Sequence, residues 1–427
     1  MAIQERIFWQ ENVAMPAINS EPPSGQVDVA VIGGGITGLS AALTLAQSGA
    51  QVALFEAQTL GWGASSRNGG MALTGLRLGI DTLLAHYGRE RAQRMFNASL
   101  AAIDTMERLV HDAQLDCDFV RYGHLELAYK PAHARHFAHL AELSEQVFQH
   151  PLRLLNQQEL AGESGSACYH GGLVDQQSAG VNPARYVAGL ARLVQQAGVQ
   201  LYVQTPVRQV VQTGTHHRVV TAQGEVRAAQ LFVGTGGYTG KATPQLQKKV
   251  FPVGSYVIVT EPLAAALAQS LAPTNRMMFD SKNFLYYFRL TPDRRLLFGG
   301  RAAFYPETPA RIRASAASSR QGMLEVYPQL RDVQIDYVWG GTIDIPFDRM
   351  PHTGHFGGIY YAIGFAGHGV AMATYLGRIV AETMACRVVD NPFTEIAFPG
   401  APLGLYNGYP WFLPFAEQWY RFQDWAF

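Results

Sequence analysis

The first residues that could do chemistry form a glycine turn. Residues 33–38 read Gly-Gly-Gly-Ile-Thr-Gly. In this spacing Gly33 permits a tight turn, Gly35 lets the backbone approach a pyrophosphate, and Gly38 lets a helix pack closely on a strand. The free N–H groups of Ile36 and Thr37, at the start of that helix, attract negative charge. The turn therefore predicts a phosphate-binding site.

A single acidic residue completes this motif. Glu56 lies eighteen residues beyond Gly38, at the end of an apolar run, and is followed by Ala57. At that place a carboxylate can accept hydrogen bonds from both hydroxyls of a ribose. A glycine turn that merely packs tightly would not explain the acid. Together the turn and the acid predict that the chain binds a dinucleotide, either FAD or NAD.

A second segment, Gly-Trp-Gly-Ala-Ser-Ser-Arg-Asn-Gly-Gly at residues 61–70, follows the acid at once. Its small residues allow the backbone to run alongside an extended cofactor, and its hydroxyl and guanidinium groups suit pyrophosphate oxygens. An ordinary polar loop is the alternative, but the position favours cofactor contact. The candidate cofactor-binding residues here are Gly63, Ala64, Ser65, Ser66, Arg67, Asn68, Gly69 and Gly70.

A third segment, Gly-Phe-Ala-Gly-His-Gly at residues 364–369, lies between a buried apolar run and a helical pattern. A helix N-terminus there would place positive dipole where a reduced flavin collects negative charge. NAD has no comparable need, so the segment favours FAD. His368 is a candidate for proton transfer, and a structural histidine is the alternative. The candidate cofactor-binding residues are Gly364, Gly367, His368, Gly369 and Val370.

Two kinds of secondary structure must position these segments. Val27–Ile32, Ile36–Gln47 and Gln51–Phe55 predict a strand, a helix and a strand, which is a βαβ unit. Alternating strands of a second sheet are expected near Tyr256–Thr260 and Leu296–Gly299. The two patterns alternate along the chain, which predicts an α/β plus α+β fold: a Rossmann-like FAD-binding domain interleaved with an antiparallel-sheet substrate domain. The predicted ranges are 1–78, 165–245 and 335–427 for the FAD-binding domain, and 79–164 and 246–334 for the substrate domain.

Composition limits the remaining possibilities. The chain has 427 residues, 48% hydrophobic and 15% charged, with 33 basic and 33 acidic residues, so no overall field favours nucleic acid. Its three cysteines form no pair, and its histidines lack metal-ligand spacing, so we expect neither a disulfide framework nor a metal. No signal peptide and no transmembrane segment is expected, which predicts a cytoplasmic protein. The oligomeric state stays open.

The sequence resembles the D-amino-acid-oxidase-like superfamily of FAD-dependent oxidoreductases, and most closely the branch containing gamma-glutamylputrescine oxidoreductase. The resemblance extends from an early Trp9 to an aromatic C-terminal tail and so covers nearly the whole chain. It is carried by DVAVIGGGITGLSAALTLAQSGAQVALFEA (28–57), GWGASSRNGG (61–70), NFLYYFRLTPDRRLLFGGR (283–301) and GIYYAIGFAGHGVAMATYLGR (358–378).

The resemblance implies what several residues bind. Glu56 and the first glycines would hold the adenosine diphosphate part of FAD, and Val207 would contact the adenine. Gly236, which follows an apolar strand, is a further cofactor candidate. The segment from Ser65 to Gly70 would run toward the isoalloxazine, and Gly367 to Val370 would face the flavin pyrimidine.

Departures from the family pattern qualify these expectations. Several relatives attach the flavin through a cysteine or a histidine, but residues 339–344 contain no cysteine and residues 61–70 no histidine, so FAD is expected to be non-covalent. The arginine that clamps a substrate carboxylate in amino-acid oxidases is replaced by Thr291, with Arg289 two residues earlier. Leu297 stands where sarcosine-oxidase-like relatives carry a lysine that helps oxygen react. Met71 stands where the branch commonly carries glutamine.

The expected function is FAD-dependent oxidation of a C–N bond of a small-molecule amine, polyamine-like or gamma-glutamyl-amine-like. The imine formed would hydrolyse to an aldehyde plus an amine or ammonia, with O2 or another acceptor taking the electrons and O2 giving H2O2. Tyr287, Arg301, Trp339 and His368 are the catalytic candidates, and Met71, Tyr287 and Arg289 the substrate-binding candidates. Two alternatives remain: oxidation of a small amino or imino acid like glycine or sarcosine, and a non-catalytic flavin-binding interaction protein that docks through its aromatic tail.

Overall fold

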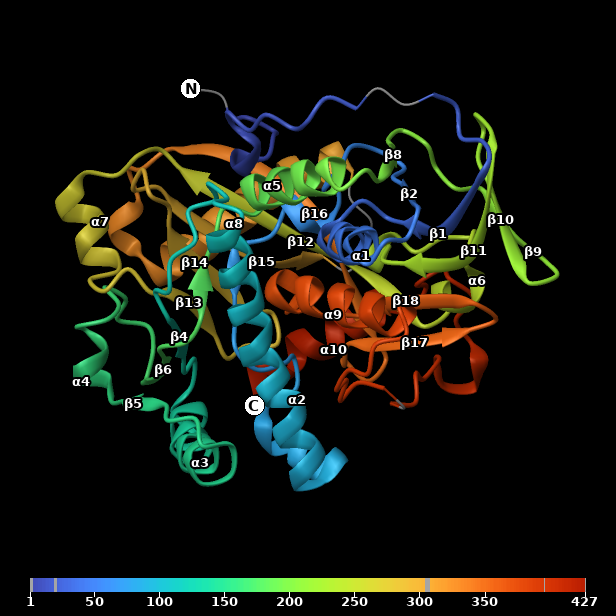
Figure 1. Ribbon diagram of the computed structural model, residues 1–427. Coiled ribbons are helices and arrows are strands. Elements are labelled where there is room, and N and C mark those ends of the chain that lie inside the picture. The colour runs from blue at the N-terminus through green and yellow to red at the C-terminus, as the bar shows by residue number, and fades with distance from the viewer. Residues whose placement is uncertain (1–2, 19–20, 304–307, 395, 427) are drawn as a thin grey trace.

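The computed structural model describes residues 3–18, 21–303, 308–394 and 396–426, with side chains omitted at 301–303 and 425–426. Two large sheets organise this part of the chain (Figure 1). The chain crosses between them several times, as the alternating sequence patterns predicted. The mixed architecture, an α/β unit combined with a largely antiparallel sheet, is therefore confirmed.

The first sheet contains the predicted βαβ unit. β1 (Gln26–Ile32) lies at its centre and pairs in parallel with β2 (Val52–Phe55) on one side and β11 (Glu225–Val233) on the other. Buried valine, alanine and isoleucine residues make these strands suitable for a sheet covered on both faces. The other strands are β8 (Gln200–Tyr202), β9 (Gln209–Thr213), β10 (His216–Val220), β17 (His352–Phe356) and β18 (Ile359–Ile363).

Four helices pack into one hydrophobic cluster beside this sheet: α1 (Ile36–Gln47), α2 (Ile80–Asp112), α5 (Pro183–Gln196) and α9 (Gly369–Met384). The close crossing of α1 and α9 depends on Gly377, because a Cβ atom there would lie 2.5 Å from the carbonyl oxygen of Thr37. The hydroxyl of Ser40 donates to the Thr374 carbonyl at 2.7 Å across the same crossing. Contact between the two backbones thus joins chain segments more than 300 residues apart.

The second sheet is mostly antiparallel, with one parallel pair, β4 with β13. One face packs against α7 (Ala265–Leu271) and α8 (Pro309–Val326), and the opposite face carries Trp339, Leu297 and Tyr287. In spatial order its strands are β16 (Ile335–Pro346), β12 (Val250–Thr260), β15 (Leu296–Ala303), β14 (Tyr286–Leu290), β13 (Met277–Asp280), β4 (His124–Leu127), β6 (Gly172–Asp175) and β5 (Arg153–Leu155).

The remaining elements are a short strand pair, four helices and five 3-10 turns among the described residues. β3 (Met71–Ala72) and β7 (Ala179–Gly180) form a short antiparallel pair. The other helices are α3 (Pro131–Phe148), α4 (Gln157–Leu160), α6 (Pro244–Gln247) and α10 (Leu413–Ala426), and the 3-10 turns are η1 (Phe8–Gln10), η2 (Ala64–Ser66), η3 (Gly236–Tyr238), η4 (Pro328–Leu330) and η5 (Pro402–Gly404).

The packing of three elements, two strands and one helix, differs from the predicted domain ranges. β6 and β16 belong to the second sheet, although both were included in the ranges of the FAD-binding domain. In addition α2, predicted in the substrate domain, packs in the helical cluster beside the first sheet. Local apolar patterns do not specify which sheet a strand joins, because strand pairing depends on contacts between residues far apart in the sequence. The domain boundaries themselves stay a prediction.

No helix in the described part of the chain is long and apolar enough to cross a bilayer. Within the same ranges, no group of three or more histidine, cysteine or acidic side chains is arranged to hold a metal ion.

Candidate active site

The glycine turn lies at the carboxyl end of β1, where it leads into α1. Gly33 has φ +107°, and a Cβ atom there would lie 2.8 Å from the carbonyl oxygen of Gly234. A Cβ atom at Gly38 would lie 1.9 Å from the carbonyl oxygen of Gly33, which is the close helix–strand approach expected for this position. Gly35 is the N-cap of α1, and the Ile36 N–H donates to the Ser65 hydroxyl at 3.0 Å. The turn and residues 61–70 are therefore in direct contact.

Glu56 follows β2 and is held by the backbone. Its two carboxylate oxygens accept the N–H groups of Gly34 at 2.7 Å and of Gln58 at 2.8 Å. Burial raises the pKa of Glu56, while these backbone donors act in the opposite direction. Each carboxylate oxygen has a second lone pair, so the fixed side chain can still accept from a ligand in the adjoining groove.

Residues 61–70 are fixed by two indoles and a guanidinium. Trp9 Nε1 donates to the Asn68 carbonyl at 2.8 Å, and Trp339 Nε1 donates to the Arg67 carbonyl at 2.9 Å. Arg67 itself donates to the carbonyls of Trp62 at 2.7 Å and Gly340 at 2.9 Å. The second sheet and the N-terminal segment thus hold the backbone that passes along the groove.

The third glycine segment begins at the carboxyl end of β18 and lies beside the first two segments. The Gly364 N–H donates to the Asp344 carboxylate at 2.5 Å, and the Ala366 N–H donates to the Asp344 carbonyl. Burial raises the pKa of Asp344 to about 6. Gly367 has φ +93°, and α9 begins two residues later with His368 as its N-cap. The positive end of the α9 dipole therefore lies at this site.

These segments line one groove of about 520 Å³. Residues after β1, β2 and β11 form one part of it, and residues from η2, β16 and α9 form another. The predicted cofactor residues that line it are Gly33, Gly35, Ile36, Thr37, Glu56, Ala57, Gly63, Ala64, Ser65, Asn68, Val207, Gly236, Gly367, Gly369 and Val370.

The other predicted cofactor residues lie beside the groove. Arg67, Gly69 and His368 line the adjoining cavity described below. Gly38, Ser66, Gly70 and Gly364 line neither cavity and act on the backbone or packing behind it. The Gly70 N–H, for example, donates to the Asn68 side chain at 2.7 Å.

The groove fits FAD on the chemistry of its walls. Glycines replace side chains where an extended ligand must approach the backbone, and Glu56 offers a carboxylate at the end of β2. The N-termini of α1 and α9, which are the positive ends of the helix dipoles, lie at two separate places along the groove. One matches an anionic pyrophosphate, and the other matches a flavin that becomes negative on reduction.

A second cavity of about 140 Å³ adjoins the groove and shares Ala64, Asn68, Ile343, Gly367 and Val370 with it. Its remaining wall combines aromatic, hydroxyl and cationic side chains with apolar ones. These lining residues are Arg67, Gly69, Met71, Leu73, Arg77, Ser255, Phe279, Leu285, Tyr287, Gly341, Ala366 and His368.

Tyr287 is placed in this wall by two glycines. A Cβ atom at Gly299, directly opposite on β15, would lie 2.2 Å from the Tyr287 ring, and one at Gly69 would lie 2.9 Å from it. The ring therefore lies against the sheet with Gly69 on its other side. Its hydroxyl is 3.2 Å from the Ser255 hydroxyl. Tyr287 was a candidate from the sequence, whereas Ser255 was not.

Arg289 and Trp339 lie behind the cavity wall. Arg289 is 3% exposed, and its guanidinium donates to the carbonyls of Gly70 at 2.6 Å and Val181 at 3.3 Å. Burial lowers the pKa of Arg289 to about 10. Trp339 is 2% exposed and holds the Arg67 carbonyl. Both side chains lie on the sheet face that carries Tyr287, but packing covers that face at their positions, so they hold neighbouring backbone and do not line the cavity.

Arg301 and Met71 are the two remaining candidates. The side chain of Arg301 lies outside the described residues. Met71 lines the second cavity, and its role in substrate binding stays a prediction.

Sequence reasoning missed Arg77, which lines the second cavity. In the structure the burial of this segment alternates, because residues 72, 74, 76 and 78 are buried while 71, 73, 75 and 77 are half-buried. This period of two is typical of an extended segment with one face toward the core. The sequence MALTGLRL places Met71, Leu73 and Arg77 on the other face, toward the cavity.

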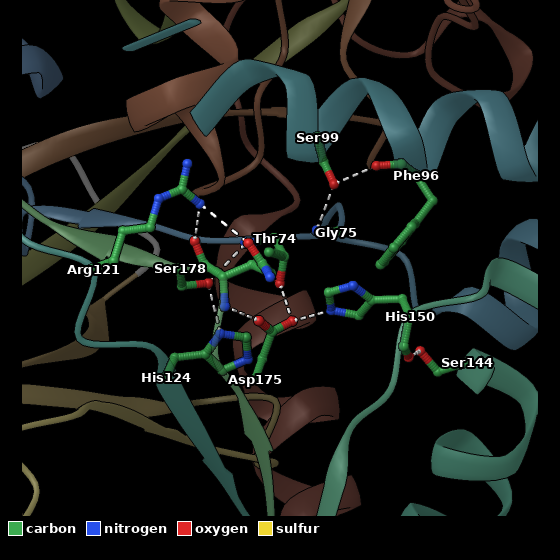
Figure 2. Close-up of polar contacts among 11 residues, drawn as sticks. Thr74, Gly75, Phe96, Ser99, Arg121, His124, Ser144, His150, Asp175 and Ser178 are labelled. Carbon is green, nitrogen blue, oxygen red and sulfur yellow. Dashed lines mark hydrogen bonds and ion pairs between the residues drawn. The ribbon is translucent and has the colours of Figure 1, made fainter. Parts of the chain in front are cut away.

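A buried polar network anchors this segment from behind (Figure 2). The Thr74 hydroxyl donates to Asp175 at 2.6 Å, and the Thr74 N–H donates to the Ser178 hydroxyl at 3.0 Å. His150 Nε2 lies 2.7 Å from the same Asp175 carboxylate, and His124 Nδ1 lies 2.8 Å from the Ser178 hydroxyl. The network therefore fixes the backbone that presents Met71, Leu73 and Arg77 to the cavity.

The fold, the glycine turn with Glu56 and the groove together define a dinucleotide-binding protein, with a second cavity adjoining the groove. The chain belongs to the FAD dependent oxidoreductase (DAO) family, whose family model matches residues 28–383. It is 35% identical over 372 residues to "Probable oxidoreductase OrdL" of Haemophilus influenzae, covering 85% of this chain and 84% of that one. It is 34% identical over 359 residues to "Gamma-glutamylputrescine oxidoreductase" of Escherichia coli, covering 84% and 83%. FAD is thus the cofactor.

The solved structures agree with the fold. Glycine oxidase from Geobacillus kaustophilus superposes with a TM-score of 0.76 at 19% identity, covering 89% of this chain and all of that one. At this level of identity the likeness concerns the fold alone.

Acid precipitation is expected to release all of the yellow cofactor into the supernatant. Among the described residues that line the two cavities there is no cysteine, and the one histidine is His368. Absorbance at the flavin band in supernatant and pellet measures the partition. Flavin retained on the pellet would contradict non-covalent binding, and the variant His368→Asn would then test whether that histidine is the attachment point.

Proposed function

We propose that the protein oxidises the C–N bond of a polyamine-like or gamma-glutamyl-amine-like substrate in the second cavity. The product imine hydrolyses to an aldehyde and an amine, or to an aldehyde and ammonia where R′ is hydrogen. With O2 as acceptor the reaction balances as R–CH2–NH–R′ + O2 + H2O giving R–CHO + R′–NH2 + H2O2. Support comes from the relatives above, of which the Escherichia coli protein is named for gamma-glutamylputrescine.

The observation that carries this proposal is the charge of the cavity wall. Of the described residues lining the second cavity, Arg67 and Arg77 are cationic and none is a carboxylate. Positive charge in a partly desolvated site lowers the pKa of a bound amine. A neutral amine keeps the nitrogen lone pair that assists removal of hydrogen from the neighbouring carbon, whereas an ammonium does not. The wall therefore favours the reactive form.

The protein's own part in the reaction is to position the amine and exclude water. FAD, when bound, accepts the two electrons removed from the C–N bond. The Tyr287 ring, fixed between Gly69 and Gly299, and the neighbouring Phe279 give the cavity an aromatic side, while Ser255 and Tyr287 offer hydroxyls for hydrogen bonds. Correct placement of the reacting carbon accounts for much of the acceleration that such a site provides.

A second candidate function is oxidation of a small amino acid. Arg77 could bind a substrate carboxylate, and the chain is 26% identical over 401 residues to "Glycine oxidase" of Geobacillus kaustophilus. The position that clamps the carboxylate in amino-acid oxidases is less favourable, since Thr291 is 4% exposed and its hydroxyl donates to Asp293 at 2.6 Å. We therefore rank this reaction below amine oxidation.

Anaerobic bleaching of the flavin distinguishes these functions. The FAD-loaded protein is mixed without oxygen with 1,4-diaminobutane, its gamma-glutamyl amide, glycine and N-methylglycine, and loss of the flavin band is followed in time. We expect the diamine or its amide to bleach the flavin at least about tenfold faster than either amino acid. Faster bleaching by glycine or N-methylglycine would replace the proposal with the second candidate. Admitting air afterwards measures whether O2 reoxidises the cofactor.

Failure of every amine and amino acid to bleach the flavin would favour an interaction protein. The tail provides a surface for that case, because Trp411, Phe415, Trp419 and Phe422 are exposed while Leu413 is buried against the body. Trp425 and Phe427, also counted in the aromatic tail, have side chains outside the described residues.

A further inference from the structure

Two oppositely charged side chains, Arg77 and Glu126, lie beside the substrate cavity. In the described part of the chain neither has a hydrogen-bond or ion-pair partner. Arg77 lines the cavity, and Glu126 lies on β4 directly opposite Phe279, which also lines it. Among the described residues, neither the Arg77 guanidinium nor the Glu126 carboxylate has a hydrogen bond or an ion pair within 4.0 Å. Both residues keep some exposed surface, although the protein closely surrounds their charged groups.

The register of the second sheet brings Glu126 to the same face as the cavity. Residues directly opposite on neighbouring strands point to one face, and Glu126, Phe279 and Tyr287 are successive partners on β4, β13 and β14. The neighbouring residues Leu125 and Leu127 point to the other face and pack in the core under α8. Glu126 therefore lies on the cavity side of the sheet, one strand beyond Phe279, which lines the cavity.

The electrostatics of this pair are unusual for a protein interior. Burial raises the pKa of Glu126 to about 7, and the charge of Arg77 acts against that shift. Burial and the like charge of the exposed Arg349 lower the pKa of Arg77, while Glu126 raises it. Buried charges are normally paired. The nearby Asp280 is paired, with Lys282 at 3.1 Å.

We propose that Arg77 and Glu126 form a recognition site for an α-amino-acid head group at one end of the substrate, in which Arg77 binds the carboxylate and Glu126 binds the ammonium. A guanidinium holds a carboxylate through two parallel N–H···O bonds, and a carboxylate accepts from an ammonium. One zwitterion supplies the partner that each side chain lacks.

This inference rests on the proposed function and narrows it. An amine held as an ammonium by Glu126 has no lone pair available and is not oxidised. The reacting amine must then belong to the other end of the same molecule, toward the groove. A gamma-glutamyl amide of a diamine has this form, with a zwitterion at one end and a basic amine at the other. Free α-amino acids do not.

The test uses probes that carry the head group but no distal amine. Gamma-glutamyl-n-butylamide has both charges, glutaryl-mono-n-butylamide lacks the ammonium, and 4-aminobutanoyl-n-butylamide lacks the carboxylate. Each is titrated into the FAD-loaded protein, and the shift of the flavin visible spectrum gives a dissociation constant. We expect loss of either charge to weaken binding about 10- to 100-fold.

Variants then connect each charge to its side chain. Arg77→Gln should weaken the full probe about 10- to 100-fold and leave binding of the probe without carboxylate within about twofold. Glu126→Gln should weaken the full probe by a similar factor and leave binding of the probe without the ammonium within about twofold. Arg349→Gln is the matched control, because it removes an exposed cation that does not line the cavity, and it should change binding by less than about threefold.

Several outcomes would overturn the head-group site. Equal binding of all three probes by the wild type would do so, as would an equal loss for all probes in Arg77→Gln. Arg77→Lys guards against misfolding, since it keeps the charge and should retain part of the discrimination. If 1,4-diaminobutane bleaches the flavin but no probe shifts the spectrum, the head-group site fails and amine oxidation stands. If no amine bleaches it, the proposed function fails.

Discussion

Gly33→Ala is expected to yield a protein without FAD and to lower the free energy of unfolding by about 2–5 kcal/mol. Two causes add at this position. The backbone has φ +107°, which side chains with a Cβ atom rarely adopt, and the new methyl would lie 2.8 Å from the carbonyl oxygen of Gly234. The turn cannot move away easily, because the Gly33 N–H donates to the Phe55 carbonyl at 2.9 Å.

Gly49→Ala provides the matched control for this variant. Gly49 also has a left-handed φ, +91°, but nothing lies within 4 Å of an added Cβ atom. It should therefore show the backbone cost alone, about 1–2 kcal/mol, and keep its cofactor. The ratio of flavin to protein absorbance and denaturant unfolding measure both effects. A Gly33→Ala protein that retains full FAD and unfolds like the Gly49→Ala protein would show that the turn tolerates a side chain.

Asp175→Asn is expected to cost about 3–5 kcal/mol of stability at neutral pH, because it replaces a buried carboxylate that several hydrogen-bond donors hold while leaving those donors in place. The Asp175 carboxylate is 2% exposed and is contacted by His150 and Thr74 (Figure 2). An exposed pair gives the control. Glu225→Gln removes the ion pair of Glu225 with Arg218, whose side chains are about half exposed, and should cost less than about 1 kcal/mol.

The stability lost in Asp175→Asn should become smaller as the pH falls. Burial alone would raise the pKa of Asp175, but the hydrogen bonds of His150 and Thr74 and the histidine charges hold it well below its ordinary value. A carboxyl whose pKa is depressed in the folded state contributes stability that is complete above its unfolded pKa, about 4, and is lost as the pH falls through the folded pKa. The difference between wild type and variant should therefore shrink below about pH 4. A difference that grows on acidification would refute this assignment.

The same variant should also weaken substrate binding. Thr74 hydrogen-bonds to Asp175 and precedes Arg77 by three residues, so loosening the network disorders the segment that lines the cavity. The amine concentration needed for half the limiting rate of flavin bleaching should rise. The limiting rate itself should change less, because the cofactor groove is built from other segments.

Much of the cofactor site follows from the sequence because its determinants are local. The strands and helix around Gly33 lie where the apolar periodicity predicts them, and α1 has the predicted bounds Ile36–Gln47. The first and third glycine motifs occur at the junction of a strand and a helix, which is a local arrangement. The groove assembles because these junctions meet at the carboxyl ends of neighbouring strands.

The substrate side was harder to predict because its determinants are distant in the chain. The period of two indicates that Arg289 and Tyr287 share a face, but only the fold reveals that Gly70 and Val181 cover that face at Arg289. Arg77 escaped notice because its partner surface comes from strands some fifty and two hundred residues away. Strand pairing of this kind depends on long-range packing and not on local propensity.

The crossing of α1 and α9 also has a consequence for how the protein folds during synthesis. α1 ends at Gln47, but its partner α9 begins at Gly369, and the close approach at Gly377 cannot form until that later segment has left the ribosome. At translation rates of about 5–20 residues per second, the apolar face of α1 waits on the order of tens of seconds. The cofactor groove, which needs both helices, is therefore completed only near the end of synthesis, and nascent chains are expected to depend on chaperones until then.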